Sequence, residues 1–527
     1  MRASQIRRHL GAAGQPLPST GTARGLQASA APGLEAPPEA PLYNLEFSPR
    51  DYVAYLLSID AEIEHCLMVQ YLYAAYSLGG PQVPEVYRDH VRNWQEVILG
   101  IAKEEMGHLM CVQNSLRLIG APLHLEREDT PWDVPFYPFP FMLEPLTLDS
   151  LAKYVYAESP EDWDGGELGD EIRRRVMAQT STPHRVAELF HRLIPLVSDP
   201  GNLPDSTFDA STCQAQADFA EWGRGYKGGH RGGSVSNRVG AGGGRDGAPR
   251  QTPDVLVVPQ TCRDDMVAAL EAVAEQGEAT TGTTASHFVR FLKIYSHMRA
   301  LIEKKPVSSE LWHAARPAAF DAARWAGLQP EAHSALLHAD ARHGWAPARA
   351  VAVNPYVSLD PEPSPSNGVP TTRITDPTSA LWATLHNLRY RMLLTYLTHS
   401  FTLYGGLDNT AGITPRGAII NATFGEMYNL RALSEILMQS PVSADDPDAG
   451  YAGPPFQMPY TLNSPFGEAD KWRGHLDLLT AAENLIQALL PLAPERQVYL
   501  NSMREADKNM VALAQRILSG SIDTALI

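Results

Sequence analysis

Two long helical patterns in the N-terminal half constrain the fold of this chain most. The first runs from about residue 49 to 78, and the second from about 85 to 119, where Gly120 and Pro122 end it. Helices of this length are stable in water only when one face is buried, so each is expected to pack against other helices. No stretch of the chain carries a convincing strand pattern. The sequence therefore predicts an all-α fold.

Further helical patterns cover much of the remaining chain. We expect helices at 145–157, 167–178, 183–197, 262–279, 284–304, 377–404, 413–439, 468–491 and 496–519. A set of four long helices occurs twice along the chain, which favours two helical bundles connected by long irregular loops.

The composition of the connecting segments indicates the domain organisation. Residues 1–42 are rich in Ala, Gly, Pro and Ser and are predicted to be disordered. A metal-binding bundle is expected over 43–305, with a Gly-rich flexible insert at 223–250. Residues 306–375 would connect it to a C-terminal helical bundle at 376–527.

Charge and cysteine usage narrow the cellular setting and the partners. The 527 residues carry a net charge of −17, so neither nucleic acid nor an anionic membrane surface is an expected partner. The four cysteines form no Cys-x-x-Cys pair and argue against a disulfide framework, and Cys66 and Cys111 are expected to be small core residues. The first residues lack the apolar core of a secretory signal, and no apolar run is long enough to cross a membrane. We expect a cytoplasmic protein, and a homodimer is compatible with the sequence.

The first predicted helix directs an acid toward the core. Residues three, four or seven apart share one face of a helix, and on this basis Glu64 lies with Leu57, Leu67 and Tyr71. Glu62 lies on a more mixed surface. Glu64 is therefore the better candidate for an inward-pointing carboxylate.

The second predicted helix directs both an acid and an imidazole inward. Glu105 and His108 share an apolar face with Ile101 and Val112. Glu104 lies beside small residues and is expected at the margin of the site or at the surface.

A third and a fourth helix complete the pattern. Glu278 continues an apolar stripe that includes Leu270 and Ala274, whereas Glu275 lies on another face and ranks second. His287 opens the following helix, and Phe291 lies one turn further along its face.

A single Glu-x-x-His pair is usually solvated, and a lone buried histidine is usually a satisfied core residue. The joint order Glu, Glu-x-x-His, Glu, His is harder to explain without a cation, because buried carboxylates are costly unless they are neutralised or bind a metal. Carboxylate and imidazole ligands suit iron or manganese. Four-helix bundles build dimetal sites from such residues.

Four stretches together resemble the ferritin-like domain of the iminophenylpyruvate dimer synthase family, which includes an enzyme of violacein biosynthesis: AEIEHCLMVQYLYAAYSLGG, IAKEEMGHLMCVQNSLRLIGAP, LTLDSLAKYVYAESPE and EQGEATTGTTASHFVRFLKI. The later GYAGPPFQMPY and the helix led by Trp472 also resemble this family. The resemblance implies a ferritin-like four-helix bundle followed by the second helical bundle. It also implies dioxygen chemistry at a dinuclear iron centre, on a small, aromatic amino-acid-derived substrate of secondary metabolism.

Carried over position by position, the ligand pattern of the family falls on Glu64, Glu105, His108, Glu278 and His287. Many relatives carry an acid where this chain has Thr284, so open metal positions would remain for water, dioxygen or substrate. The aromatic loop Trp132–Phe141 is either a lid over the substrate or a packed cover over helix ends.

Two other functions compete with an oxidase or oxygenase. The protein could be a non-catalytic metal-binding scaffold, or a manganese enzyme acting on peroxide. The C-terminal bundle is interpreted as structural, because Glu426 and Glu435 lie nine residues apart and neither His386 nor His399 forms a Glu-x-x-His pair.

Overall fold

The computed structural model describes most of the predicted helical regions and the connections between several of them. The described residues are 47–128, 137–222, 240–243, 249–250, 255–278, 286–305, 345–357, 370–409, 412–459, 462 and 464–521. The predicted disordered segment 1–42 and most of the predicted connection 306–375 lie outside these residues.

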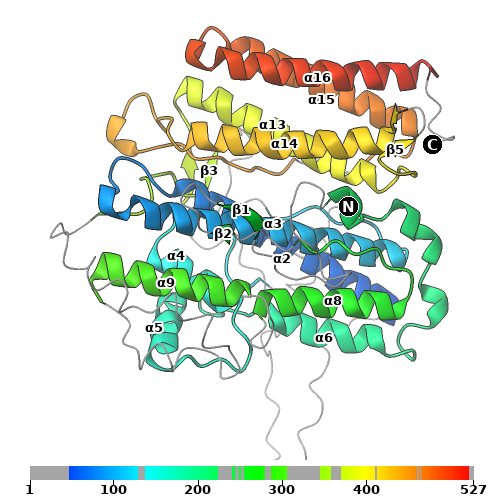
Figure 1. The fold of residues 1–527 in the computed structure, drawn as a ribbon, viewed down its shortest axis with the longest axis horizontal. Helices are drawn as coiled ribbons and strands as arrows, with labels where there is room; N and C mark the ends of the chain where they lie inside the picture. Colours follow the sequence, from blue (N-terminus) through cyan, green and yellow to red (C-terminus); the bar gives the residue numbers. More distant parts are fainter. Residues whose placement is uncertain are drawn as a thin grey trace, which may run out of the picture.

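Two antiparallel helices form the centre of the first bundle (Figure 1): α2 (Pro49–Ser77) and α3 (Arg88–Leu118). Ser48 caps α2 by accepting a hydrogen bond from the backbone N–H of Asp51, and Pro49 starts the helix where no N–H partner is needed. Their observed bounds agree closely with the predicted ones.

The other side of the first bundle consists of shorter helices. Its main members are α4 (Leu148–Ala157), α5 (Gly166–Met177), α6 (Ala187–Ser198), α8 (Arg263–Glu278) and α9 (His287–Glu303). Helices α8 and α9 follow one another in a single row, with α4 packed against α9 and α6 packed against α8 (Figure 1). This row of two helices is thus interrupted between α8 and α9, at the level where α4 ends and α9 begins.

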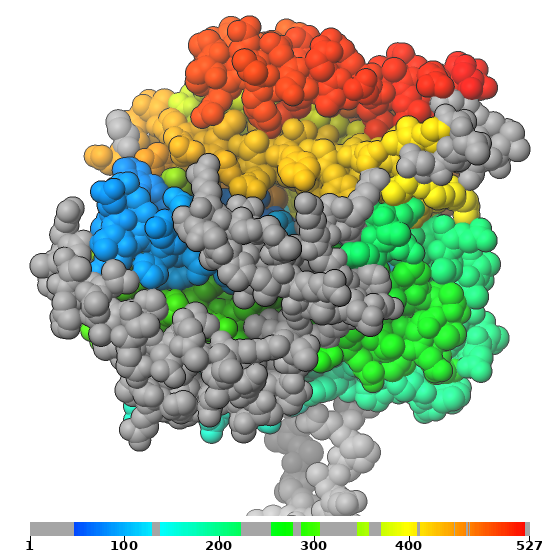
Figure 2. Space-filling view, viewed as in Figure 1, coloured from blue at the N-terminus to red at the C-terminus, as the bar shows by residue number. Residues whose placement is uncertain are grey.

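Four helices form the C-terminal bundle: α13 (Pro377–Ser400), α14 (Pro415–Leu437), α15 (Glu468–Leu489) and α16 (Gln497–Leu518). They stack as layers on the first bundle, with α15 and α16 furthest from α6 and α8 (Figure 2). A second apolar core fills the space between these helices and includes Trp472, Leu479 and Leu500.

The larger apolar core runs from the first bundle into α13 and α14, because Leu394 and Ile420 belong to the same cluster as the buried residues of α2. A buried polar contact joins the bundles as well. The Nδ1–H of His65 donates to the carbonyl of Leu125, and its Nε2 accepts from the hydroxyl of Tyr390 at 2.5 Å. α13 is therefore fixed directly against the helix that carries Glu64.

Short elements complete the described fold. The sequence predicted no strands, whereas three small pairs occur: β1 (Gly240–Gly243) with β2 (Pro249–Arg250), β3 (Pro355–Tyr356) with β4 (Thr372–Arg373), and β5 (Asp408–Asn409) with β6 (Gly412–Ile413). Strands of two to four residues are too short to show an alternating pattern. The single-turn helix α7 (Phe219–Trp222) and several 3₁₀ turns add to these: Glu85–Tyr87, Asp205–Thr207, Ala210–Ala215, Pro447–Ala449 and Pro494–Arg496.

The Gly-rich insert 223–250 was predicted to be a flexible loop. Of its residues only β1 and β2 are described, and they pair in antiparallel orientation. In the described part of the chain, no helix has a stretch that is both long and apolar enough to cross a membrane.

Candidate metal centre

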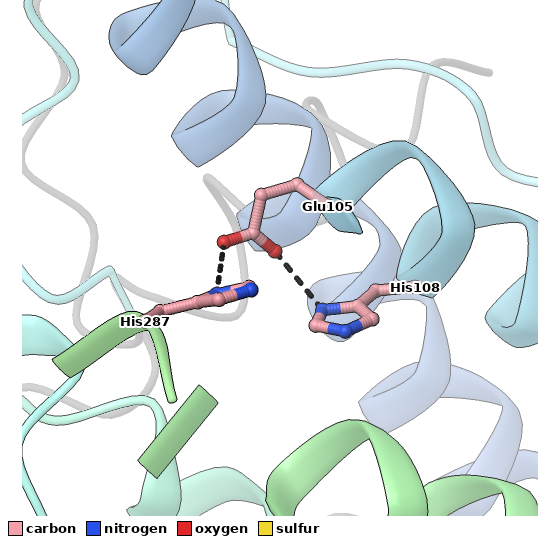
Figure 3. A group of neighbouring side chains, drawn as sticks. All are labelled: Glu105, His108 and His287. Carbon is pink, nitrogen blue, oxygen red and sulfur yellow. Dashed lines mark hydrogen bonds and ion pairs between the residues drawn. The ribbon is translucent and has the colours of Figure 1, made fainter. Parts of the chain in front are cut away.

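The two carboxylate oxygens of Glu105 each face a different imidazole inside the first bundle (Figure 3). Its Oε1 is 2.8 Å from Nδ1 of His287, and its Oε2 is 3.0 Å from Nδ1 of His108. All three side chains are at most 2% exposed, and each offers a donor atom within 4.8 Å of the others. Within the described residues, they are the group of His, Cys and acidic side chains with spacing suited to a metal ion.

One of these contacts is close without being a hydrogen bond. Oε1 of Glu105 and Nδ1 of His287 are both buried, and neither has a hydrogen-bond partner in the described structure despite their 2.8 Å separation. Between a carboxylate and a protonated imidazole, this contact is a buried ion pair. A cation bound by both atoms would take the place of the imidazole proton.

Glu64 extends the group from α2. Its Oε2 lies 3.3 Å from Nδ1 of His108, the same nitrogen that faces Glu105. The outer nitrogen of this ring, Nε2, lies 2.8 Å from Oε1 of Gln276 on α8. Gln276 thereby fixes the ring so that Nδ1 faces the two carboxylates, as outer partners of metal-binding histidines commonly do.

Glu104 performs the same role for His287, which agrees with its predicted place at the margin of the site, whereas the alternative place at the surface is wrong. It is buried, and its Oε2 lies 3.0 Å from Nε2 of His287. The guanidinium of Arg290 also donates to both oxygens of Glu104. Facing along α3 alone could not show this, because the partner that covers Glu104 comes from α9.

Glu158, which the facing argument did not consider, also belongs to the site. It follows the last residue of α4, and its Oε2 lies 3.7 Å from Nδ1 of His287. Its Oε1 accepts a 2.6 Å hydrogen bond from the hydroxyl of Tyr71 on α2. Both side chains are buried. The signal was present in the sequence, since Glu158 continues the apolar face of α4 that carries Leu151 and Val155.

The local electrostatics are those of tightly coupled acids and imidazoles. Burial raises the pKa of Glu64 well above its ordinary value, and the neighbouring Glu105 raises it further. Burial also opposes the charge on Glu105, but His287 and His108 hold its pKa well below its ordinary value. Burial lowers the pKa of His108, yet Glu64 and Glu105 outweigh that effect and raise the pKa to about 10. The site therefore favours positive charge at its centre.

A small cavity opens beside these carboxylates. Its volume is about 20 Å³, measured as the space open to the centre of a water molecule, and it has room for one or two waters or ions. Its walls include the site residues Glu64, Glu105, His108 and Glu158 together with Leu67, Phe190 and Val273. The apolar part of this lining limits the water that can reach the carboxylates.

The other acids considered as ligands either lie outside this group or have side chains that are not described. Glu278 is the last residue of α8, and its side chain lies outside the described residues, as does Thr284. Glu275 is exposed and so faces away from the site. Glu62 is buried rather than on a mixed surface, but it lies 3.7 Å from His124 instead of joining the group.

The buried face of α8 is centred about one residue away from the predicted stripe. Met266, Leu270 and Val273 are buried, whereas Val267 and Ala274 are only half-buried. This rotation is what directs Gln276 to His108.

Part of the aromatic loop Trp132–Phe141 is packed rather than free. Tyr137, Phe139 and Phe141 are buried, and Arg127 lies over the ring of Phe141 at 4.7 Å. Residues 129–136 lie outside the described structure, so the lid reading of that part stays a prediction. Cys66 and Cys111 are buried, which confirms their predicted place in the core.

Polar groups of the C-terminal bundle pair with one another. Glu426 accepts from Arg389 at 2.9 Å, and Glu435 forms a surface ion pair with Arg431. Nδ1 of His399 lies 2.7 Å from Nε2 of His475.

Comparisons with known proteins agree with this architecture. Residues 57–296 match a family model described as Ferritin-like, a range that includes every site residue named above. This region has the ferritin-like fold. A dichlorochromopyrrolate synthase from Lentzea aerocolonigenes is 34% identical over 151 residues, covering 24% of this chain. The chain spans only 14% of the length of that relative. No solved structure matches the chain. The chain is thus an all-α protein whose ferritin-like bundle carries a candidate metal centre.

Proposed function

We propose that the ferritin-like bundle binds a dinuclear non-haem metal centre, with iron as the metal, and that the protein is a dioxygen-dependent oxidase or oxygenase. The ligands would be Glu64, Glu105, His108, Glu158 and His287. Glu278 stays a candidate for a further ligand. One observation carries the proposal: the two oxygens of Glu105 face the Nδ1 atoms of two different imidazoles.

The donor atoms fit such a centre. Carboxylate oxygens and imidazole nitrogens without thiolates suit iron or manganese better than a structural zinc. A carboxylate whose two oxygens face two different imidazoles is suited to bridge two ions. When bound, iron would supply the binding and reduction of dioxygen, a chemistry that protein side chains lack.

The protein side chains prepare the donor atoms. Glu104 and Gln276 hold the outer nitrogens of His287 and His108, which leaves each Nδ1 directed at the centre. The hydroxyl of Tyr71 orients Glu158 by occupying one of its oxygens, so that the other faces His287. The apolar walls of the cavity keep bulk water away and strengthen these interactions.

The substrate proposed is small and derived from an aromatic amino acid, within secondary metabolism. The resemblance of the four sequence stretches supports this class, and the partial similarity to a dichlorochromopyrrolate synthase supports a synthase that acts on a small molecule. Coupling of two imines, hydroxylation and desaturation all fit the same ligands.

Dioxygen uptake tests the proposal. Metal-free protein is loaded anaerobically with Fe(II), oxygen consumption is followed after mixing with buffered dioxygen, and bound iron is measured in the same sample. We expect uptake by the loaded protein and its loss in Glu105→Ala, whereas Glu435→Ala at the surface should behave as the unchanged protein. Iron bound without any uptake would favour the scaffold function. Manganese in the purified protein together with peroxide breakdown would favour the peroxide enzyme.

A further inference from the structure

Asp60 is a buried acid that none of the roles above explains. It lies on α2 four residues before Glu64, so the two side chains share one face of the helix. Asp60 is 0% exposed, and neither of its carboxylate oxygens has a hydrogen-bond partner in the described structure. Buried acids are normally paired, so this one requires an explanation.

The other buried acids nearby show what is unusual about Asp60. Glu104 has Arg290 as a partner, and Glu62 has His124 close by. Asp60 has neither a guanidinium nor an ammonium group against it among the described residues. The groups that act on it most strongly are His108, which favours its charged form, and Glu105, which opposes it. Asp60 thus lies one helical turn from the proposed ligand Glu64, on the same face of α2, and His108 and Glu105 act on its charge.

The charges of the site indicate how many ions it accommodates. Four buried carboxylates lie in this region without an Arg or Lys partner in the described structure: Asp60, Glu64, Glu105 and Glu158. Neutral imidazoles contribute no charge when they bind metal through Nδ1. Two divalent cations neutralise four ionised carboxylates, whereas a single cation would leave Asp60 buried as a neutral acid without a hydrogen-bond partner.

We propose that Asp60 is a fourth carboxylate of the metal centre, on the side of His108, and that it is required for the second divalent cation to bind. This inference rests on the proposed function, because it assumes that the bundle binds metal. It goes beyond the ligand set taken from facing and from the resemblance, which does not include Asp60. Without metal, burial raises the pKa of Asp60 to about 7, so the neutral acid predominates below that pH.

Counting bound ions tests the inference. Metal-free protein is titrated anaerobically with Mn(II), and free Mn(II) is quantified by its electron paramagnetic resonance signal. We expect the unchanged protein to bind two ions and Asp60→Asn to bind one. Alternatively, the second ion should bind to Asp60→Asn at least tenfold more weakly, which corresponds to about 1.4 kcal/mol of binding free energy. Glu62→Gln is the matched control, because it removes a buried acid two residues away that faces His124, and it should still bind two ions.

The outcomes separate the two proposals. Two ions with unchanged affinity in Asp60→Asn would overturn the role of Asp60 while leaving the metal centre intact. No Mn(II) bound by the unchanged protein would instead overturn the proposed function. Circular dichroism of the metal-free proteins provides a second readout: Asp60→Asn should fold and be at least as stable as the unchanged protein, because it replaces a costly buried acid. A metal-free variant that fails to fold would show a structural role and overturn the inference.

Discussion

Replacing Glu104 by glutamine tests the claim that residues outside the ligand set prepare the metal centre. Glu104 touches no atom proposed to bind metal; it holds Nε2 of His287 at 3.0 Å and pairs with Arg290. Glutamine has the same shape but loses the charge that orients the ring and neutralises the guanidinium. We therefore expect weaker metal binding at the side of His287, with the ligands themselves unchanged.

The magnitude follows from the contacts. Loss of an outer partner of a metal-binding histidine typically costs about 10- to 100-fold in metal affinity, or roughly 1.4–2.7 kcal/mol. Breaking a buried ion pair also costs stability, about 3 kcal/mol where the remaining charge has no other partner. Arg290 is in that position, because Glu104 supplies its ion pair in the described structure. Glu104→Gln should thus lose both metal affinity and stability.

Glu426→Gln in the C-terminal bundle separates these effects. Glu426 is also a buried acid paired with an arginine, Arg389, but it lies in the other bundle. This control should lose stability in urea without any change in Mn(II) affinity. Equal Mn(II) affinity in Glu104→Gln and the unchanged protein would refute the reasoning, since His287 would then need no support from Glu104.

Three further changes have outcomes that follow from single contacts. Tyr71→Phe keeps the packed ring but frees one oxygen of Glu158, so Mn(II) affinity measured by titration should fall by about tenfold while the far-ultraviolet circular dichroism stays the same; unchanged affinity would show that the hydroxyl does not orient the carboxylate. Gly107→Ala places a Cβ 2.6 Å from the carbonyl oxygen of Leu256, so urea unfolding should show a loss of about 1–3 kcal/mol; a variant as stable as the unchanged protein would contradict this close approach. His386 is buried and neutral because burial lowers its pKa to about 3, whereas the unfolded chain takes up that proton near pH 6.5. Its contribution to stability is therefore present above pH 6.5 and is lost as the pH falls toward 3, by about 2 kcal/mol between pH 7 and 5. Between pH 7 and pH 5, the free energy of unfolding in urea should fall by about 2 kcal/mol less in His386→Gln than in the unchanged protein. An equal fall in both proteins would mean that the ring is protonated in the native state.

Helical periodicity predicted most of the described fold because its signal is repeated along each helix. The bounds of α2 and α3 agree closely with the predicted ranges, since Ser48 and Gly120 mark ends that local chemistry determines. The short strands could not be predicted in this way. Pro355 and Thr372, for example, pair although they belong to separate segments of the chain, and no repeating sequence pattern predicts such a pair.

The candidate site was predictable where the apolar face of a single helix directs a side chain inward, as it does for Glu64, Glu105, His108 and His287. Glu105 and His108 are three apart on one face, and the same rule directed Glu64 inward. Glu158 follows the end of α4, so a search for Glu-x-x-His pairs does not detect it. Gln276 carries no charge and was not considered, although its amide holds His108. Such partners depend on how separate helices are rotated, which the sequence of one helix does not determine.

Anomalous diffraction from crystals of the purified protein tests the central claim most directly. Data collected on both sides of the iron and manganese absorption edges identify the metal and locate each ion. The account predicts two ions within the first bundle, bridged by Glu105, with Nδ1 of His108 bound to one and Nδ1 of His287 bound to the other. Crystals of metal-loaded protein with no ion at Glu105, or with both imidazoles hydrogen-bonded to carboxylates around an empty centre, would contradict it.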